Sequence, residues 1–249
     1  MKFSRRFALF FLCLCGMLAA CQKRLPTSIR AKAEQRLPKK LQEKMAAHNI
    51  DQYAPIMMRF FKEESIAEVW KQNRMGSFVL VARYDICKWS GQLGPKYREG
   101  DFQAPEGFYK IGANQMNPYS KYYLSFNVGF PNLYDQANGR TGSYLMVHGG
   151  CASAGCYSMN DENMAQIYAF ARDAFRGGQK EFQLQAFPFR MTDENMMRHR
   201  LSPHYQFWTV LKEGYDIFEM ERKPPKVDVY EKRYVFNQFT DKGSMSIIP

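Results

Sequence analysis

The stretch SYLMVHGGCASAGCY, residues 143–157, decides how this chain folds locally and what it can do. Its first six residues read as a β-strand that ends at His148, and glycines and small residues then lead to Cys156. Gly155 allows the backbone to turn directly before Cys156 without a Cβ clash. The spacing therefore predicts a strand followed by a tight turn that brings Cys156 back beside the imidazole of His148.

That arrangement is typical of cysteine nucleophiles. A thiol attacks carbonyl groups well only as a thiolate, and a neighbouring imidazole can generate it. Backbone amides around Cys156, including those of Gly155 and Tyr157, could face a developing oxyanion. A helix expected to start with Asp161 as its N-cap would add a positive terminus. We therefore predict Cys156 as the nucleophile and His148 as its base, with a thiol that reacts below the ordinary pKa of about 8.5.

The surrounding pattern predicts an α+β, β-rich fold, because many strands are interspersed with a few helices and no βαβ alternation occurs. Asp161 to Arg176 shows the clearest helical spacing and is closed by Gly177-Gly178. The expected strands are two within 56–71, then 77–86, one ending the segment 102–114, 121–130, 143–148 and 181–189. The expected helices lie within 38–50, after Thr192, and over 203–218. The tail to residue 249 shows no clear period.

The first twenty residues are typical of an export signal. Basic residues precede Phe7–Leu18, an apolar run of twelve residues that is too short to span a bilayer as a mature helix. The run ends in Leu18-Ala19-Ala20-Cys21, which resembles the lipobox of bacterial lipoproteins, so we expect lipidation at Cys21. An ordinary cleaved signal peptide and a retained transmembrane helix are the alternatives. By analogy with sorting in Gram-negative cells, Gln22 favours the outer membrane.

Domain division follows from composition. We expect a signal peptide over 1–20, a basic tether with a short helix over 21–50, a catalytic domain over 51–210, and a helix end with an irregular tail over 211–249. Formal net charge is +11, and residues 22–50 hold eight basic against two acidic residues. This concentration argues against a basic nucleic-acid surface spread over the fold. The tether could bind anionic lipid or the acidic cell wall, or be a solvated linker.

Six cysteines occur in the chain, and Cys87, Cys151 and Cys156 remain after the export segment and the lipidated residue. An oxidising exterior favours one disulfide and leaves one thiol over, and catalysis is one reason for an unpaired thiol. A Cys87–Cys151 bridge would leave Cys156 free, but Cys156 could also be a bridge partner. Cys87, His148, Cys151 and Cys156 could instead bind zinc. His148 could also be a core histidine.

Several other side chains are candidate substrate contacts. Arg140 and Arg190 could bind a carboxylate in a bidentate manner, or could form surface ion pairs. Trp89 and Tyr144 could line a cleft, or pack in the core or at an edge. Ser153, in the turn between His148 and Cys156, is a further candidate substrate contact.

Together these motifs resemble the L,D-transpeptidase (YkuD-type) catalytic domain. Ser153-Ala154-Gly155-Cys156 is similar to the family signature Ser-His-Gly-Cys, except that Ala154 replaces a second histidine and Ser158 stands where many members carry arginine. The compact spacing from His148 resembles the YafK-like branch. Roughly residues 50–210 share the resemblance, and its further motifs are Ile86–Gly91, Leu93–Lys96, Gln103–Tyr109, Ser125–Asn127, Gly139–Gly142 and Phe187–Thr192.

The resemblance implies a YkuD-like β-rich fold that needs no cofactor and no metal. It implies a thioester between Cys156 and a diaminopimelate-containing peptidoglycan stem peptide, which is then captured by an amine or by water. His148 would act as base and later as acid, and the carbonyl of Gly149 would orient its imidazole. In the YafK-like branch, hydrolysis would release a wall-bound lipoprotein. The expected location is the periplasmic side of a Gram-negative envelope. The alternative is an inactive, lipid-anchored peptidoglycan-binding module of the same fold.

Overall fold

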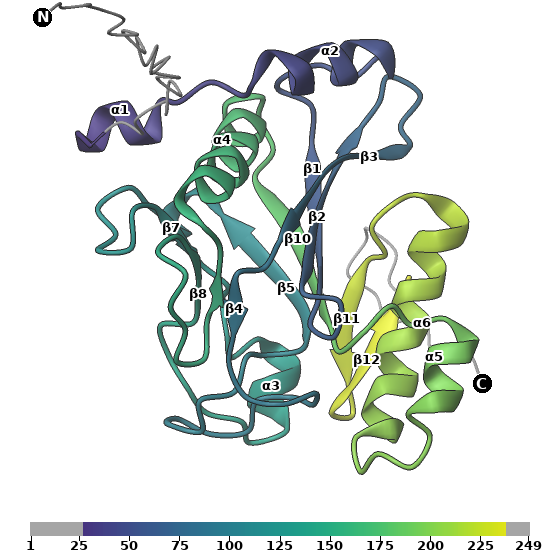
Figure 1. Cartoon of the computed structure of the whole chain (residues 1–249). Coiled ribbons are helices and arrows are strands. Elements are labelled where there is room, and N and C mark those ends of the chain that lie inside the picture. The colour runs from purple at the N-terminus through teal and green to yellow at the C-terminus, as the bar shows by residue number, and fades with distance from the viewer. Residues whose placement is uncertain (1–26, 238–249) are drawn as a thin grey trace, which may run out of the picture.

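The computed structural model describes residues 27–237. In this range the chain forms two five-stranded sheets, a separate two-stranded hairpin and a few helices (Figure 1). The helices are α1 (Ile29–Ala33), α2 (Lys39–Ala47), α3 (Leu133–Ala137), α4 (Asp161–Arg176), α5 (Asp193–Arg198) and α6 (Tyr205–Glu221), with a 3-10 turn at Ala113–Gln115. The strands are β1 (Ile56–Phe61), β2 (Ile66–Gln72), β3 (Phe78–Asp85), β4 (Lys88–Trp89), β5 (Gly107–Gly112), β6 (Met116–Asn117), β7 (Ser125–Asn127), β8 (Met146–His148), β9 (Tyr157–Ser158), β10 (Glu181–Phe187), β11 (Val227–Tyr230) and β12 (Arg233–Phe236).

The larger sheet has the order β3-β2-β1-β10-β5. Every residue of β1 is buried, because this strand is covered on both faces. It pairs antiparallel with β2 across the predicted turn at residues 62–65, and parallel with β10. Helix α4 packs against this sheet, as the contacts of α4 with β1 show.

The smaller sheet has the order β4-β9-β8-β7-β6 and is built from very short strands. Its central pair, β8 and β9, runs parallel although only eight residues separate the two strands. Parallel neighbours usually need a long crossover. The intervening segment makes this connection as a compact turn, with backbone in the left-handed region at Gly150, Cys151 and Gly155. The segment predicted as a strand over 121–130 contributes only β7.

Helix α4 joins the two sheets. Its apolar face lies against β1 of the larger sheet and against β7 and β8 of the smaller one (Figure 1). The predicted bounds are confirmed, but the predicted cap is wrong. Asn160 is the N-cap and accepts a hydrogen bond from the Asn163 amide, whereas Asp161 is the first helical residue. The Asp161 side chain is therefore available for another contact.

The C-terminal part differs from the predicted division. Helix α6 runs from Tyr205 to Glu221, so a boundary at residue 210 would cut through it. Residues 227–236 form the β11–β12 hairpin rather than an irregular tail, and Glu231 and Lys232 at its turn both have positive φ. This two-residue turn lacks the glycine or asparagine that usually signals such a hairpin. The hairpin packs on α6 around a second apolar cluster that includes Phe108, Phe187 and Trp208.

The strand predicted over 143–148 is shorter than expected, because only Met146–His148 pairs in the sheet, and the short elements α1, α3, β4, β6 and β9 were not predicted. The other predicted helices are present. The helix expected within 38–50 is α2, Thr192 caps α5, and the helix expected over 203–218 is α6. The predicted signal peptide and Cys21 lie outside the described residues. Between residues 27 and 237, no helix is both long enough and apolar enough to cross a bilayer.

Candidate active site

Strands β8 and β9 position His148 and Cys156. Val147 lies opposite Tyr157, and His148 lies opposite Ser158. Because side chains alternate along a strand, Cys156, which directly precedes β9, projects from the same face as Ser158 and His148. The amide of Met146 donates a hydrogen bond to Cys156 Sγ at 3.3 Å, which fixes the sulfur beside the start of β8. His148 lies two residues further along that strand, on the same face as the sulfur.

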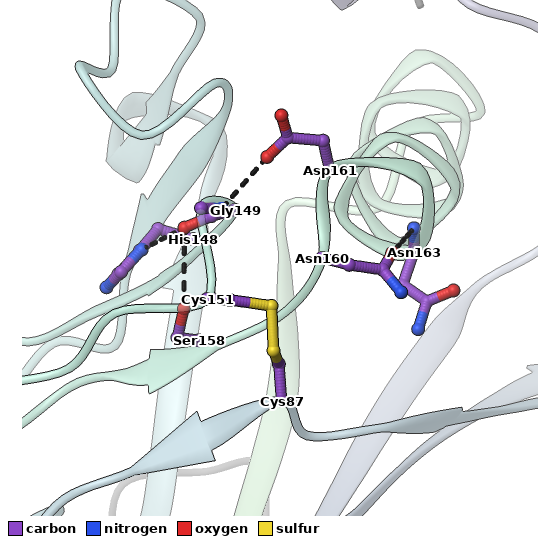
Figure 2. The surroundings of a disulfide bond; sticks show 9 residues. Cys87, His148, Gly149, Cys151, Ser158, Asn160, Asp161 and Asn163 are labelled. Atoms are coloured by element: carbon purple, nitrogen blue, oxygen red, sulfur yellow. Dashed lines mark hydrogen bonds between the residues drawn. A yellow bond between two sulfur atoms is a disulfide. The ribbon is translucent and has the colours of Figure 1, made fainter.

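The imidazole of His148 is oriented by its own chain neighbour. Its Nδ1 lies 2.6 Å from the carbonyl oxygen of Gly149, and Ser158 Oγ donates to the same oxygen at 3.4 Å (Figure 2). A carbonyl can only accept, so Nδ1 carries the proton and Nε2 of the neutral ring is left with a free lone pair. The ring of Tyr122 covers the imidazole with a centroid separation of 4.8 Å. His148 is therefore in the tautomer that a general base requires.

Two tethers hold the turn between His148 and Cys156. Asp161 at the start of α4 accepts a hydrogen bond from the Gly150 amide at 2.9 Å. A disulfide joins Cys151 to Cys87, the residue before β4, with Cα atoms 5.3 Å apart (Figure 2). Cys156 is the free cysteine of the described chain. The Cys87–Cys151 disulfide, which the sequence alone did not decide, is thus present, and it leaves Cys156 as a free thiol.

This bridge also removes two alternatives. Cys156 is not a disulfide partner in this structure, and a zinc site made from all four candidate ligands is not possible because Cys87 and Cys151 are bonded to each other. Over residues 27–237, no group of three or more potential metal ligands comes together.

Burial favours the neutral forms of both Cys156 and His148. Burial raises the pKa of the Cys156 thiol, against the hydrogen bond from Met146 and the charge of Lys96, which both lower it. Burial likewise lowers the pKa of His148, against the hydrogen bond to Gly149, which raises it. Both directions oppose the predicted depression of the thiol pKa, and they favour a mechanism in which His148 removes the thiol proton during attack.

Comparisons with known proteins identify the family of this chain. The L,D-transpeptidase catalytic domain, YkuD, matches residues 58–180. Over 186 residues, the chain is 48% identical to "Putative L,D-transpeptidase YafK" of Escherichia coli (strain K12), covering 74% of this chain and 75% of that protein. The protein of the same name from Escherichia coli O157:H7 matches with the same values. This chain belongs to the L,D-transpeptidase family.

Solved structures are more distant from this chain. The helical cell shape determining protein Pgp2 from Campylobacter jejuni has a TM-score of 0.44 and 15% identity, covering 77% of this chain and 80% of that one. Bd1075 of Bdellovibrio bacteriovorus has a TM-score of 0.40 and 16% identity, covering 75% of this chain and 84% of that one.

Two predicted site residues, Ser153 and Gly155, shape the turn before Cys156. Ser153 Oγ donates to the Cys156 carbonyl at 2.7 Å and accepts from Ser90 Oγ at 2.7 Å and from the Gly155 amide at 3.3 Å. Its hydrogen-bonding capacity is thus used within the protein. Gly155, at φ +121°, allows the bend, but its amide faces Ser153 in this resting structure. The amides of Cys156 and Tyr157 remain the candidate oxyanion donors of the L,D-transpeptidase site.

Most of the other predicted substrate contacts bind partners within the protein. Arg140 is 7% exposed and forms a 2.8 Å ion pair with Asp135. Its guanidinium is therefore engaged inside the fold and does not line a cleft. Arg190 pairs with Glu68 at 2.7 Å. Trp89 donates to Ser65 Oγ and packs against the core. Tyr144 alone has an open side chain, 78% exposed, and its carbonyl oxygen lies 3.8 Å from Cys156 Sγ.

Sequence reasoning missed three residues around this site. Asp161 was predicted as a cap but accepts a hydrogen bond from the turn, Tyr122 covers the imidazole, and the charge of Lys96 lowers the pKa of the Cys156 thiol. Lys96 had a signal, because it stands in one of the motifs shared with the family. Tyr122 had none, since an aromatic residue in a β-rich chain is usually core.

The neutral pair predicts a specific pH dependence. Turnover should fall as pH decreases through the pKa of His148, because a protonated imidazole cannot accept the thiol proton. Burial lowers that pKa, so the acidic limb of kcat/KM should lie below about pH 6.5. Burial raises the thiol pKa, so Cys156 alkylation should rise only above about pH 8.5. Steady-state rates across pH test the acidic limb of kcat/KM, and iodoacetamide labelling across pH tests the pKa of the Cys156 thiol. An alkylation midpoint near pH 5 would show a preformed ion pair instead.

Proposed function

We propose that this chain is a cysteine acyl-transfer enzyme that acts on stem peptides of peptidoglycan. The observation that supports this most is the free thiol of Cys156 on the same strand face as His148, whose Nδ1 is held at 2.6 Å from the Gly149 carbonyl. Membership of the L,D-transpeptidase family supports a diaminopimelate-containing stem peptide as the proposed substrate class. The geometry supports Cys156 as the nucleophile and His148 as the base.

The reaction has two half-reactions. In the first, His148 Nε2 takes the proton from Cys156, and the sulfur attacks the carbonyl carbon of the stem peptide. The amides of Cys156 and Tyr157 receive the developing oxyanion. The imidazolium then protonates the leaving amine, the peptide bond breaks, and a thioester remains on Cys156. In the second, an amine or water attacks the thioester carbonyl carbon and gives a proton to His148. The C–S bond then breaks, and the imidazolium returns the proton to the Cys156 thiolate.

The acceptor determines the biological outcome. An amine acceptor forms a new cross-link, which is transpeptidation. Water as acceptor gives hydrolysis, and a stem peptide that carries a wall-linked lipoprotein would then release it. Both outcomes pass through the same thioester, so both are included in the proposal.

We also propose that the mature protein is attached through a lipid on Cys21 to the periplasmic side of the outer membrane. The apolar run of twelve residues followed by Leu18-Ala19-Ala20-Cys21 supports this. The basic residues between Cys21 and α2 would help the protein approach anionic lipid or the acidic wall.

Product analysis tests the proposal. Purified protein is incubated with defined tetrapeptide muropeptides and with lipoprotein-linked stem peptides, each with and without an added amine, and the products are identified by mass spectrometry. Amide exchange with the amine identifies a transpeptidase, and incorporation of one oxygen from labelled water identifies a hydrolase. Binding of muropeptides without any product would support the inactive wall-binding module instead.

A further inference from the structure

The ring of Tyr122 packs against the imidazole of His148, and the core does not account for its position. The two ring centroids are 4.8 Å apart, and 35° separates the ring planes. Tyr122 is 51% exposed, so it buries little apolar surface there. In the described part of the chain, its hydroxyl has no protein hydrogen-bond partner. The aromatic ring, and not the phenol group, is therefore the part of Tyr122 that contacts the base.

The turn after His148 holds this ring in place. The Gly149 amide donates a hydrogen bond to the Tyr122 carbonyl at 3.0 Å. A Cβ at Gly150 would lie 3.1 Å from Tyr122 Cδ1, so the missing side chain allows the ring to approach the turn. The segment that follows the imidazole thus also fixes the loop that covers it.

Tyr123 anchors the same loop on the N-terminal segment. Its backbone lies in the left-handed region, at φ +70°. Lys32 donates to its carbonyl at 2.8 Å, and Gln35 donates to its hydroxyl at 2.6 Å. A strained conformation of this kind persists only where the surroundings determine it. These contacts engage Tyr123 and leave the ring of the neighbouring Tyr122 against His148.

In the proposed reaction, His148 carries a positive charge between its two proton transfers. Burial disfavours that charge and lowers the pKa of His148. The carbonyl oxygen of Gly149, 2.6 Å from Nδ1, stabilises the charged imidazole at its edge. An aromatic face attracts a cation within about 6 Å of its centroid, and the ring of Tyr122 lies within that range of the imidazole.

We propose that the aromatic face of Tyr122 stabilises the imidazolium form of His148 while this residue holds the proton of Cys156. Tyr122 is a positioning residue in this role, because it acts through His148 and needs no contact with substrate. The role rests on the proposed acyl transfer, in which His148 is the base. An interaction that is stronger with the charged than with the neutral imidazole favours the state that forms during the reaction.

Other titratable groups also surround the imidazole. Cys156 lies on the same strand face, Asp161 at the start of α4 is hydrogen-bonded to the turn, and the exposed Lys121 directly precedes Tyr122. The phenol of Tyr123 is hydrogen-bonded to the N-terminal segment. All of these groups are retained when Tyr122 is substituted, so a difference between its variants reports on the ring.

Three substitutions of Tyr122 separate the aromatic face from the hydroxyl and from simple coverage. Tyr122→Phe keeps the face and removes the hydroxyl. Tyr122→Leu keeps an apolar side chain over the imidazole but removes the face, and Tyr122→Met does the same with an unbranched side chain. Tyr119→Leu is the matched control, since it removes a tyrosine ring that is 74% exposed in the same loop.

The measurement is the pKa of His148 in the purified, folded protein, followed by NMR through the Cε1–H signal of its imidazole. The His148→Gln variant assigns this signal among those of the four histidines. Tyr122→Phe and Tyr119→Leu should titrate like the parent. Tyr122→Leu and Tyr122→Met should lower the pKa of His148 by about 0.4–0.7 pH unit, because the charged form loses its aromatic contact.

Turnover of a defined muropeptide gives a second readout. The plateau of kcat/KM for Tyr122→Leu should fall about 2–5-fold, and its acidic limb should move to lower pH. Tyr122→Phe should retain the parental plateau and limb. Misplacement of the base alone would lower the plateau without the matching shift of the limb.

An unchanged or raised pKa of His148 in Tyr122→Leu would overturn the proposal, because the ring would then only cover the imidazole. Tyr122→Phe titrating like Tyr122→Leu would assign the effect to the hydroxyl, and an equal shift in Tyr119→Leu would assign it to the loop as a whole; either result also overturns the proposal. Should Tyr122→Leu not fold, Tyr122→Met decides by the same criterion. The titration needs no substrate, so failure of the proposed acyl transfer would appear separately, as absent product in proteins whose His148 still responds to the aromatic ring.

Discussion

Cys156→Ala should abolish product formation while the protein remains folded. Removing the nucleophile of a covalent mechanism leaves no route to the thioester, so the rate should fall at least about 10³-fold. The expected stability change is small, because the substitution removes one half-buried sulfur whose two hydrogen bonds, from the Met146 amide and to the Tyr144 carbonyl, are long. The measurements are turnover of defined muropeptides and the thermal unfolding midpoint.

Two variants complete this experiment. Cys156→Ser keeps a hydrogen-bond acceptor near the Met146 amide but is a far weaker nucleophile beside a neutral imidazole, so it should also be inactive. Met75→Ala changes a methionine that is 85% exposed in the turn between β2 and β3, and it should retain full activity. Turnover by Cys156→Ala within about tenfold of the parent would assign the chemistry to another residue.

Loss of the Cys87–Cys151 bridge should destabilise the fold and impair the site together. The bridge closes a loop with a sequence separation of 64 residues, and the chain-entropy relation gives roughly 4 kcal/mol for a loop of that size. The Cys87→Ser/Cys151→Ser double variant should therefore unfold about 8–16 °C lower than the parent. Calorimetry or circular dichroism measures this shift.

The effect on catalysis follows from the position of Cys151 in the turn between His148 and Cys156. With the tether removed, Asp161 still holds Gly150, but the segment nearer Cys156 loses its covalent support. A misplacement of about 1 Å can reduce turnover about 10²-fold. We expect a fall in kcat of about 10–100-fold, measured at a temperature where the double variant is folded. An unfolding midpoint and a kcat that both equal the parental values would show that the bridge supports neither the fold nor the turn.

Much of the fold could be predicted from local sequence patterns. The amphipathic spacing of α4 and the β-rich run of β3 are strong signals, because a single face of each must be buried. The β11–β12 hairpin was missed because its turn, Glu231-Lys232, carries residues that rarely adopt positive φ. The hairpin is instead stabilised by packing on α6 and around Phe108 and Phe236, which local sequence does not reveal.

The part of the candidate site whose residues lie close together in the sequence was predictable. His148 and Cys156 lie eight residues apart among glycines, so the sequence itself implied their proximity. The Cys87–Cys151 bridge, the Asp161 tether and the Lys96 charge depend on long-range contacts. Arg140 was misjudged for the same reason: its partner Asp135 is near in sequence, but the burial that makes the pair structural comes from aromatic residues of distant segments.

The most direct test of the account is the identity of the covalent intermediate. The protein is mixed with a tetrapeptide stem substrate in the absence of amine, quenched with acid within the first turnover, and digested for mass spectrometry. The account predicts a peptide containing Cys156 that carries the acyl portion of the stem and loses it on treatment with hydroxylamine. Product formation with no adduct at any time point, or with the acyl group on a residue other than Cys156, would contradict it.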